Sequence, residues 1–214
     1  MSEPVSFDIY HPKPLLVVIS GPSGVGKDAA LKSLQHRNFP YHFVVTATTR
    51  APRMGEKYGV DYFFLNHQEF QKMIDNNEFI EYAKVYDDFK GIPRKQIDSA
   101  LASGKDVILR LDVQGAARIR SLFIDAVLIF LLPSSYEEWH KRLMDRGSES
   151  IQSMQRRVDT ARSEMNSVSQ FDYVIINSEG RLEATVDTIT HIIDSEHHSV
   201  KRSCDIPGGY NQVG

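Results

Sequence analysis

A short apolar segment that runs directly into a glycine-rich turn most constrains how this chain can fold. Residues 15–19 are continuously apolar, which is typical of a strand buried on both faces. Residues 28–35 follow with the pattern of a helix. A buried strand, a glycine-rich turn and a helix in this order favour an α/β domain built on a parallel sheet.

The turn itself matches the Walker A spacing, Gly-x-x-x-x-Gly-Lys, in the strand-to-helix context that this pattern requires. Glycine permits backbone angles that turn successive N–H groups toward an anion at a helix N-terminus. We therefore predict a phosphate loop that binds the triphosphate of ATP, with the lysine ammonium reaching the β and γ phosphates. The alternative is a tight strand–helix turn that is glycine-rich by chance. The predicted ATP-binding residues are Gly21, Pro22, Ser23, Gly24, Val25, Gly26, Lys27 and Asp28.

Asp28 stands where the pattern normally has a serine or threonine that binds Mg²⁺. A carboxylate could also bind the metal, which makes Asp28 the candidate metal ligand, but it would repel phosphate. An acidic residue in the first turn of a helix is also favourable for purely structural reasons. Both interpretations stay open.

The alternation of strand and helix returns along the chain and predicts three layers, with a central parallel sheet between helices. Strands are expected at residues 106–112, 126–132 and 173–176, each followed by a helix, at 114–123, 136–146 and 182–197. Two segments break this rhythm. Residues 44–103 carry shorter, more polar strands at 61–65 and 79–86 around a helix at 68–75, and residues 137–168 are rich in arginine and predict two helices joined at Gly147. The predicted core therefore comprises residues 14–43, 104–136 and 169–198, with an inserted α+β lobe at 44–103, a helical lid at 137–168, and tails at 1–13 and 199–214.

Composition narrows the class of protein further. The chain has 214 residues, a formal net charge of −3 and one cysteine, so neither a nucleic-acid-coating surface nor a disulfide framework is expected. The first 13 residues lack the apolar segment of a signal peptide, and no apolar stretch is long enough to cross a bilayer. We expect a protein of a reducing compartment, cytoplasmic or the interior of an organelle, without nucleic-acid or membrane partners and monomeric or weakly dimeric.

A second motif predicts a site for another phosphate. Arg50 and Arg53 lie three residues apart around a proline, and Glu56 and Tyr62 follow closely. Guanidinium groups bind a phosphate monoester in a bidentate manner, and a carboxylate can fix the pose of one of them. On its own, such a loop is as often a solvated surface.

With these motifs in place, the chain resembles the guanylate kinases through TTRAPRMGEKYGVDYFF, EFQKMIDNNEFIEYAKVY, LDVQGAARIR and FDYVIIN, in this order. The resemblance covers residues 14–197. It implies the reaction ATP + GMP ⇌ ADP + GDP with Mg²⁺ as cofactor, on a P-loop kinase fold of core, GMP-binding lobe and lid. Some departures from the family pattern resemble a plant organellar branch.

The resemblance also implies roles for individual residues. Glu81 would read guanine by accepting hydrogen bonds from N1–H and the 2-amino group, which adenine cannot offer. Asn177 would lie near the ATP base. The catalytic residues implied are Lys27, Arg50, Arg146 and Arg157, and the GMP-binding residues are Thr46, Arg50, Arg53, Glu56, Tyr62, Glu81, Lys90 and Asp112.

Besides Asp28, three positions depart from the family pattern. A phosphate-contacting tyrosine becomes Lys90, which could still contact phosphate as a cation, and a hydroxyl that helps to read guanine becomes Ile92, which cannot. The third is the acid two residues before Asp112, which is Arg110 here. We hypothesise that Arg110 and Asp28 form a charge-swapped ion pair, which requires their charged atoms to lie within about 4 Å.

Two other functions stay open. The same scaffold could serve a kinase with a different nucleoside monophosphate as acceptor. It could also be a catalytically inactive module that binds a protein ligand. The intact Lys27 argues against the module, whereas Asp28 mildly favours it.

Overall fold

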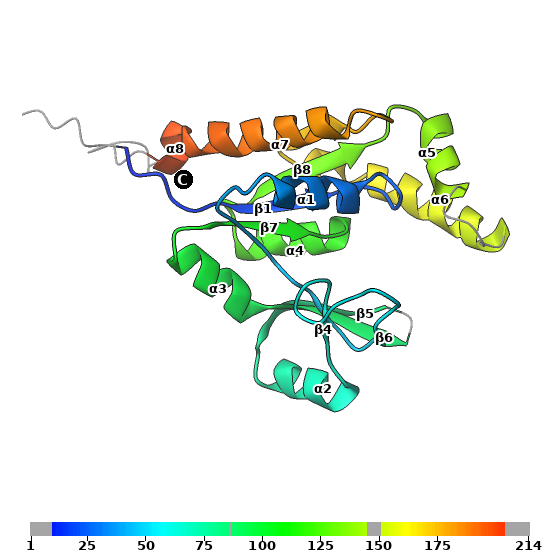
Figure 1. Ribbon diagram of the computed structural model, residues 1–214, viewed down its shortest axis with the longest axis horizontal. Helices are drawn as coiled ribbons and strands as arrows, with labels where there is room; N and C mark the ends of the chain where they lie inside the picture. Colours follow the sequence, from blue (N-terminus) through cyan, green and yellow to red (C-terminus); the bar gives the residue numbers. More distant parts are fainter. Residues whose placement is uncertain (1–9, 86, 145–150, 204–214) are drawn as a thin grey trace, which may run out of the picture.

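A five-stranded sheet forms the centre of the molecule. The computed structural model describes residues 10–85, 87–144 and 151–203. The sheet contains β1 (Leu16–Ser20), β2 (Tyr41–Phe43), β7 (Asp106–Arg110), β8 (Val127–Leu132) and β9 (Tyr173–Ile176) in the order β2-β7-β1-β8-β9. All four strand pairings are parallel. The predicted α/β class with a central parallel sheet is confirmed (Figure 1).

Helices cover both faces of this sheet because side chains along each strand alternate between two apolar clusters. Val17 and Ile19 belong to one cluster together with buried residues of α1 (Lys27–His36) and α7 (Leu182–His197). Leu16 and Val18 belong to the other, with residues of α3 (Arg94–Ala102) and α4 (Val113–Leu122). The result is the expected three layers of helix, sheet and helix.

A second, four-stranded sheet lies beside the core. It contains β3 (Ala47–Thr48), β4 (Phe63–Phe64), β5 (Phe79–Val85) and β6 (Asp88–Pro93) in the order β4-β3-β6-β5, with one parallel and two antiparallel pairings. Helix α2 (His67–Asp75) packs on it, and the Phe70 ring stacks between Phe79 and Phe89. We call residues 47–93 the small lobe, which lies below the core in Figure 1.

The helices of the predicted lid are α5 (Tyr136–Met144) and α6 (Ile151–Met165), followed by the short 3₁₀ helix η1 (Val168–Gln170). The proposed junction at Gly147 and the residue Arg146 lie outside the described residues. Of the predicted C-terminal tail, α8 (Val200–Ser203) is helical. Within the described ranges, no helix combines the length and apolarity needed to cross a membrane.

Several boundaries differ from the sequence prediction. The strand expected at 106–112 ends at Arg110, because the Asp112 side chain accepts a hydrogen bond from the Gly115 N–H and caps α4. The strand expected at 61–65 is only Phe63–Phe64. Helix α3 was not predicted, and its buried Ile97 and Ala100 pack with the core although α3 lies within residues 44–103. The exact boundaries of core, lobe and lid stay predictions.

Candidate active site

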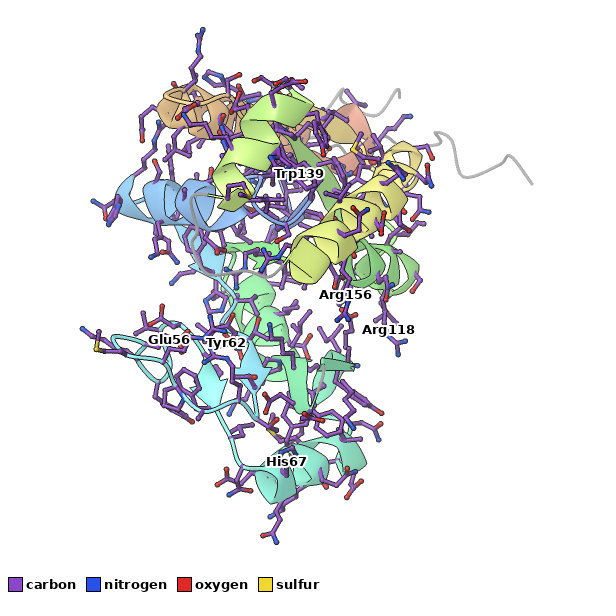
Figure 2. All side chains as sticks on the ribbon, turned by 90° about the vertical axis from the view of Figure 1, so that its right-hand side faces the viewer. Glu56, Tyr62, His67, Arg118, Trp139 and Arg156 are labelled. Carbon is purple, nitrogen blue, oxygen red and sulfur yellow. The ribbon has the colours of Figure 1, made fainter. Side chains whose placement is uncertain are left out.

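A cleft of about 400 Å³ lies between the carboxyl ends of the core strands and the small lobe. Ligands of open parallel sheets bind at this edge, where the loops after the strands converge. In Figure 2, Trp139 of α5 and Arg156 of α6 lie on the core side, and Tyr62 and Glu56 lie on the small lobe below. The lining residues are Ser23, Gly24, Gly26, Lys27, Asp28, Thr46, Tyr62, Glu81, Tyr82, Ala83, Lys90, Gly91, Ile92, Arg110, Leu111, Asp112, Gly115 and Glu164.

The phosphate loop forms the core side of this cleft. Gly21 and Gly26 have φ angles of 135° and 100°, a region that side-chain-bearing residues rarely adopt. A Cβ atom would also collide with the Leu131 carbonyl at Gly21 and with the Asn177 amide at Gly26. Gly26 caps α1 without any side-chain hydrogen bond, so the N–H groups at the start of α1 are not capped by a side chain.

Side chains from distant elements hold this loop in place. The Asn177 Nδ2 and Arg142 Nη1 atoms both donate to the Val25 carbonyl, at 2.7 and 3.2 Å. The Trp139 indole N–H donates to the Ser23 carbonyl at 2.8 Å. The buried amide of Asn177, expected near the ATP base, therefore supports the loop backbone. Neither Arg142 nor Trp139 was a predicted site residue.

Lys27 lies within the cleft, and its ammonium donates to the carbonyls of Gly21 and Pro22. Burial lowers the pKa of Lys27, and the carboxylates of Glu164 and Asp28 oppose that shift. Glu164, on α6, was also missed from the sequence. Its Oε2 atom is buried without a hydrogen-bond partner among the described residues, and burial raises the pKa of Glu164 while Lys27 lowers it. Arg157, Ala161 and Glu164 are spaced by four and three residues, so they share one face of α6, and this spacing could have indicated Glu164 from the sequence.

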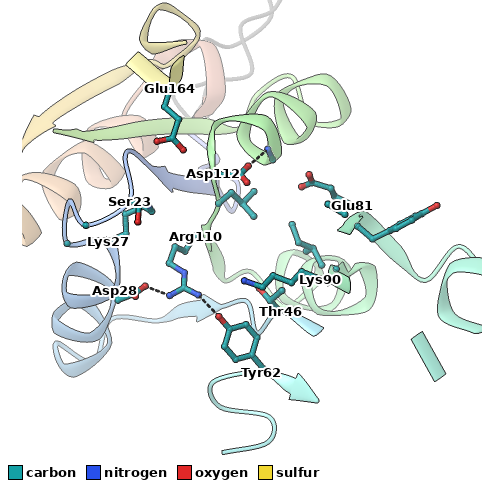
Figure 3. Close-up of a pocket in the computed structure, with 18 residues that line it drawn as sticks. Ser23, Lys27, Asp28, Thr46, Tyr62, Glu81, Lys90, Arg110, Asp112 and Glu164 are labelled. Atoms are coloured by element: carbon teal, nitrogen blue, oxygen red, sulfur yellow. Dashed lines mark hydrogen bonds and ion pairs between the residues drawn. The ribbon is translucent and has the colours of Figure 1, made fainter. Parts of the chain in front are cut away.

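Arg110 and Asp28 form the hypothesised ion pair, which is confirmed. Nη1 of Arg110 donates to Oδ1 of Asp28, well within the 4 Å criterion (Figure 3). Nη2 of the same guanidinium lies 3.4 Å from the Tyr62 hydroxyl. Burial lowers the pKa of Arg110, but the Asp28 carboxylate and Tyr62 outweigh this effect and raise it.

The arginine motif lies beside the cleft. Arg50 Nη2 donates to both carboxylate oxygens of Glu56 at 2.9 Å, and the Arg50 guanidinium carbon lies 5.3 Å from the Tyr62 ring centroid. The Arg53 N–H donates to Glu56 and lowers the pKa of that carboxyl, as the Arg50 contact also does. Tyr62 lines the cleft, whereas Arg50, Arg53 and Glu56 are not among its lining residues.

The opposite end of the cleft is acidic. Glu81 pairs with Ile92 across strands β5 and β6, and both face the cleft together with Asp112 and Thr46. Burial raises the pKa of Glu81, and the neighbouring Asp112 carboxylate raises it further. Ile92 is buried among core residues. The two adjacent carboxyl groups offer hydrogen-bond acceptors to a base with neighbouring N–H groups.

From the lid side, Arg157 Nη1 donates to the Ser23 hydroxyl at 3.2 Å, which places this predicted catalytic cation at the phosphate loop.

No group of three or more histidine, cysteine, aspartate or glutamate residues suited to a metal occurs in the described parts of the chain. Mg²⁺ in kinases is usually bound by one or two carboxylates together with substrate phosphates. Asp28 beside the phosphate loop fits that donor set.

Comparison with known proteins agrees with this geometry. The family model for guanylate kinase matches residues 13–196. The chain belongs to the guanylate kinase family. It is 48% identical over 197 residues to guanylate kinase 2, chloroplastic/mitochondrial, of Oryza sativa subsp. japonica, covering 91% of this chain and 69% of that protein. It is 41% identical to the guanylate kinase of Caldanaerobacter subterraneus subsp. tengcongensis, covering 90% and 92% of the two chains.

A solved structure supports the same assignment. The crystal structure of guanylate kinase from Anaplasma phagocytophilum matches with a TM-score of 0.72 and 30% identity, covering 91% of this chain and 92% of that one. The fold and the sequence motifs thus agree, and as a guanylate kinase family member the protein is a nucleoside monophosphate kinase.

Proposed function

We propose that the protein transfers the γ-phosphoryl group of ATP to GMP, and also to dGMP, with Mg²⁺ as cofactor. The observation that carries this proposal is the composition of one cleft. A phosphate loop with Lys27 forms one end, and the paired carboxyl groups of Glu81 and Asp112 form the other. A triphosphate donor and a guanine-bearing acceptor fit these two ends in line.

Base recognition would depend on Glu81. Its carboxylate accepts hydrogen bonds from N1–H and the 2-amino group of guanine, a pair of donors that adenine and the pyrimidines lack in this arrangement. Asp112 already uses Oδ1 to cap α4, at 2.8 Å from the Gly115 N–H, which leaves Oδ2 for the 2-amino group. Thr46, which also lines the cleft, would supply a hydroxyl.

Phosphoryl transfer needs alignment and charge neutralisation more than covalent chemistry, so no dedicated general base is required. Lys27 and the lid residues Arg157 and Arg146 would neutralise the transferring group, and Arg50, Arg53 and Tyr62 would hold the acceptor phosphate. Asp28 would hold Mg²⁺, which would supply charge neutralisation at the donor phosphates. Closure of the small lobe and lid would exclude water.

A coupled ADP-release assay with GMP, dGMP, AMP, CMP and UMP tests the proposal. We expect turnover with GMP and dGMP, and loss of turnover in Lys27→Ala. Preference for AMP would favour a kinase with another acceptor, and absence of turnover with every acceptor would favour a protein-binding module. Gel filtration at several protein concentrations tests the expected monomer or weak dimer, and imaging of a tagged full-length protein tests the expected cytoplasmic or organellar interior.

A further inference from the structure

Arg110 connects three parts of the molecule that meet at the cleft. It ends the core strand β7, bonds Asp28 in the first turn of α1, and reaches the Tyr62 hydroxyl of the small lobe at 3.4 Å. Figure 3 shows its guanidinium between these two partners, with Lys90 close by. The ion pair therefore stands between the phosphate loop and the expected position of the acceptor phosphate.

Three cations surround the Tyr62 ring. Arg110 bonds its hydroxyl, the Arg50 guanidinium carbon lies 5.3 Å from the ring centroid, and the Lys90 ammonium lies 5.9 Å from it. Arg50 is neutralised by Glu56 and Arg110 by Asp28, whereas Lys90 forms no ion pair within the described ranges. Lys90 alone cannot balance a phosphate monoester dianion, so Arg110 can contribute beside the proposed phosphate ligands Arg50 and Arg53.

The two existing ion pairs differ in how easily they exchange partners. Arg50 binds both oxygens of Glu56, and the two side chains are only 21% and 20% exposed. Arg110, whose side chain is 34% exposed, binds a single oxygen of Asp28, whose side chain is 57% exposed. A partly exposed pair held through one oxygen contributes less free energy and opens more easily than a shielded bidentate pair.

We propose that Arg110 is a ligand of the acceptor phosphate, and that it exchanges Asp28 for this phosphate when the acceptor binds. The inference rests on the proposed function. The exchange leaves the Asp28 carboxylate without its counter-ion, next to the phosphate loop, where it can accept a divalent cation. Binding of either substrate thus breaks the Arg110–Asp28 ion pair and frees the residue that the other substrate uses. Acceptor and donor therefore bind with positive coupling, which by linkage is reciprocal.

Calorimetric titration of the full chain with GMP tests the exchange, with and without saturating Mg²⁺ and a non-hydrolysable ATP analogue. For the wild type we expect the donor to tighten GMP binding by about fivefold or more, at the lower end of typical couplings. Arg110→Gln should weaken GMP binding by about tenfold and bring the coupling ratio close to one, because a charge-assisted contact is lost. Arg110→Lys should retain part of the affinity.

The Asp28→Asn variant gives the sharper result, because it releases Arg110. GMP binding without donor should become tighter, and the coupling should disappear. Since removal of a carboxylate also reduces its direct repulsion of phosphate, the double variant Asp28→Asn/Arg110→Gln completes a cycle. If Asp28 acts through Arg110, its substitution changes GMP affinity in the wild type but not in Arg110→Gln. An equal change in both backgrounds would overturn the exchange.

Arg37→Gln is the matched control. Arg37 follows α1 and pairs with Glu183 and Asp187 on the surface, away from the cleft, so this variant should bind GMP like the wild type. Thermal melting of each variant checks folding. GMP binding with the same coupling ratio in all proteins would overturn this inference alone, whereas absence of GMP binding to the wild type would overturn the proposed function.

Discussion

The side-chain amide of Asn177 donates a 2.7 Å hydrogen bond to the main-chain carbonyl of Val25, in the middle of the phosphate loop. The Oδ1 atom of the same Asn177 side chain accepts a hydrogen bond from the Thr185 hydroxyl at 2.9 Å, and both side chains are buried. The carboxyl end of β9 and the first turns of α7 thus fix the shape of a loop more than 150 residues earlier in the chain.

Replacement of Asn177 by leucine should damage both stability and donor binding. It removes the shorter hydrogen bond of the Val25 carbonyl and of the Thr185 hydroxyl, which keep their longer contacts to Arg142 at 3.2 Å and to the Arg181 carbonyl at 3.3 Å. Each lost hydrogen bond costs about 0.5–1.5 kcal/mol. We expect a lower free energy of unfolding in urea and an ATP affinity weaker by about tenfold, the equivalent of one such hydrogen bond.

The matched control for this change is Thr188→Val, on the same helix. The Thr188 hydroxyl is exposed and donates only to the Ala184 carbonyl, so its loss should affect neither property by more than about 0.5 kcal/mol. An Asn177→Leu protein that is less stable but binds ATP normally would show that Asn177 supports the fold and not the loop.

The only tryptophan of the chain, Trp139, provides a direct signal of donor binding. Its indole N–H donates to the Ser23 carbonyl of the phosphate loop, and the ring is almost fully buried. Occupation of the loop by a triphosphate should therefore change the intrinsic fluorescence in a saturable manner. The ATP concentration at half of the maximal fluorescence change should agree with the Kd for ATP measured by calorimetry. Lys27→Ala should move this half-maximal point to a higher ATP concentration. A fluorescence signal that GMP alone reproduces would contradict this assignment.

Glu81→Gln should separate stability from base recognition. Burial and the Asp112 carboxylate raise the pKa of Glu81, so ionisation of Glu81 is harder in the folded than in the unfolded chain. The folded protein binds the extra proton between the two pKa values, and wild-type stability falls relative to the Gln variant as pH rises through that interval. The variant should consequently melt at a higher temperature at neutral pH, and this gain should vanish below the ordinary carboxyl pKa.

The same variant should bind GMP about a hundredfold more weakly. The glutamine NH₂ group replaces one acceptor oxygen and faces a guanine donor, and the remaining hydrogen bond loses its charged acceptor, at about 1.5 kcal/mol for each change. Calorimetry measures this loss, and Glu78→Gln, an exposed acid just before β5, is a suitable control. Unchanged GMP affinity in Glu81→Gln would place guanine recognition elsewhere in the cleft.

Ile92→Thr should restore a hydroxyl opposite Glu81 at some cost in stability. Ile92 is buried among core residues, and the change replaces its ethyl group by a hydroxyl, whose burial alone costs about 1–3 kcal/mol. We expect a lower melting temperature together with a few-fold higher ratio of kcat/KM for GMP over AMP, the size of effect expected from one hydrogen bond. Ile92→Val, which removes one methylene group, separates the packing effect, and an equal ratio in both variants would argue against a role for the hydroxyl.

The parallel core and the phosphate loop could be predicted from the sequence, because their signals are local. Apolar runs at 15–19 and 126–132 define buried strands, and the spacing of Gly21 to Lys27 defines the loop between strand and helix. The charge-swapped pair of Asp28 and Arg110 was also predictable, since two linked departures from the family pattern pointed to it. The small strands of the lobe were harder to predict, because segments of two or three residues carry no periodicity.

The distant side chains that support these motifs could be identified from the three-dimensional arrangement alone. Trp139, Arg142, Asn177 and Glu164 reach the phosphate loop or its lysine from the lid and from the end of β9, and the packing of α3 joins it to the core. Such contacts depend on how helices and strands pack in space, whereas the pattern along the chain reports only which face of each element is apolar. Packing therefore determined the surroundings of residues whose chemistry the sequence had already indicated.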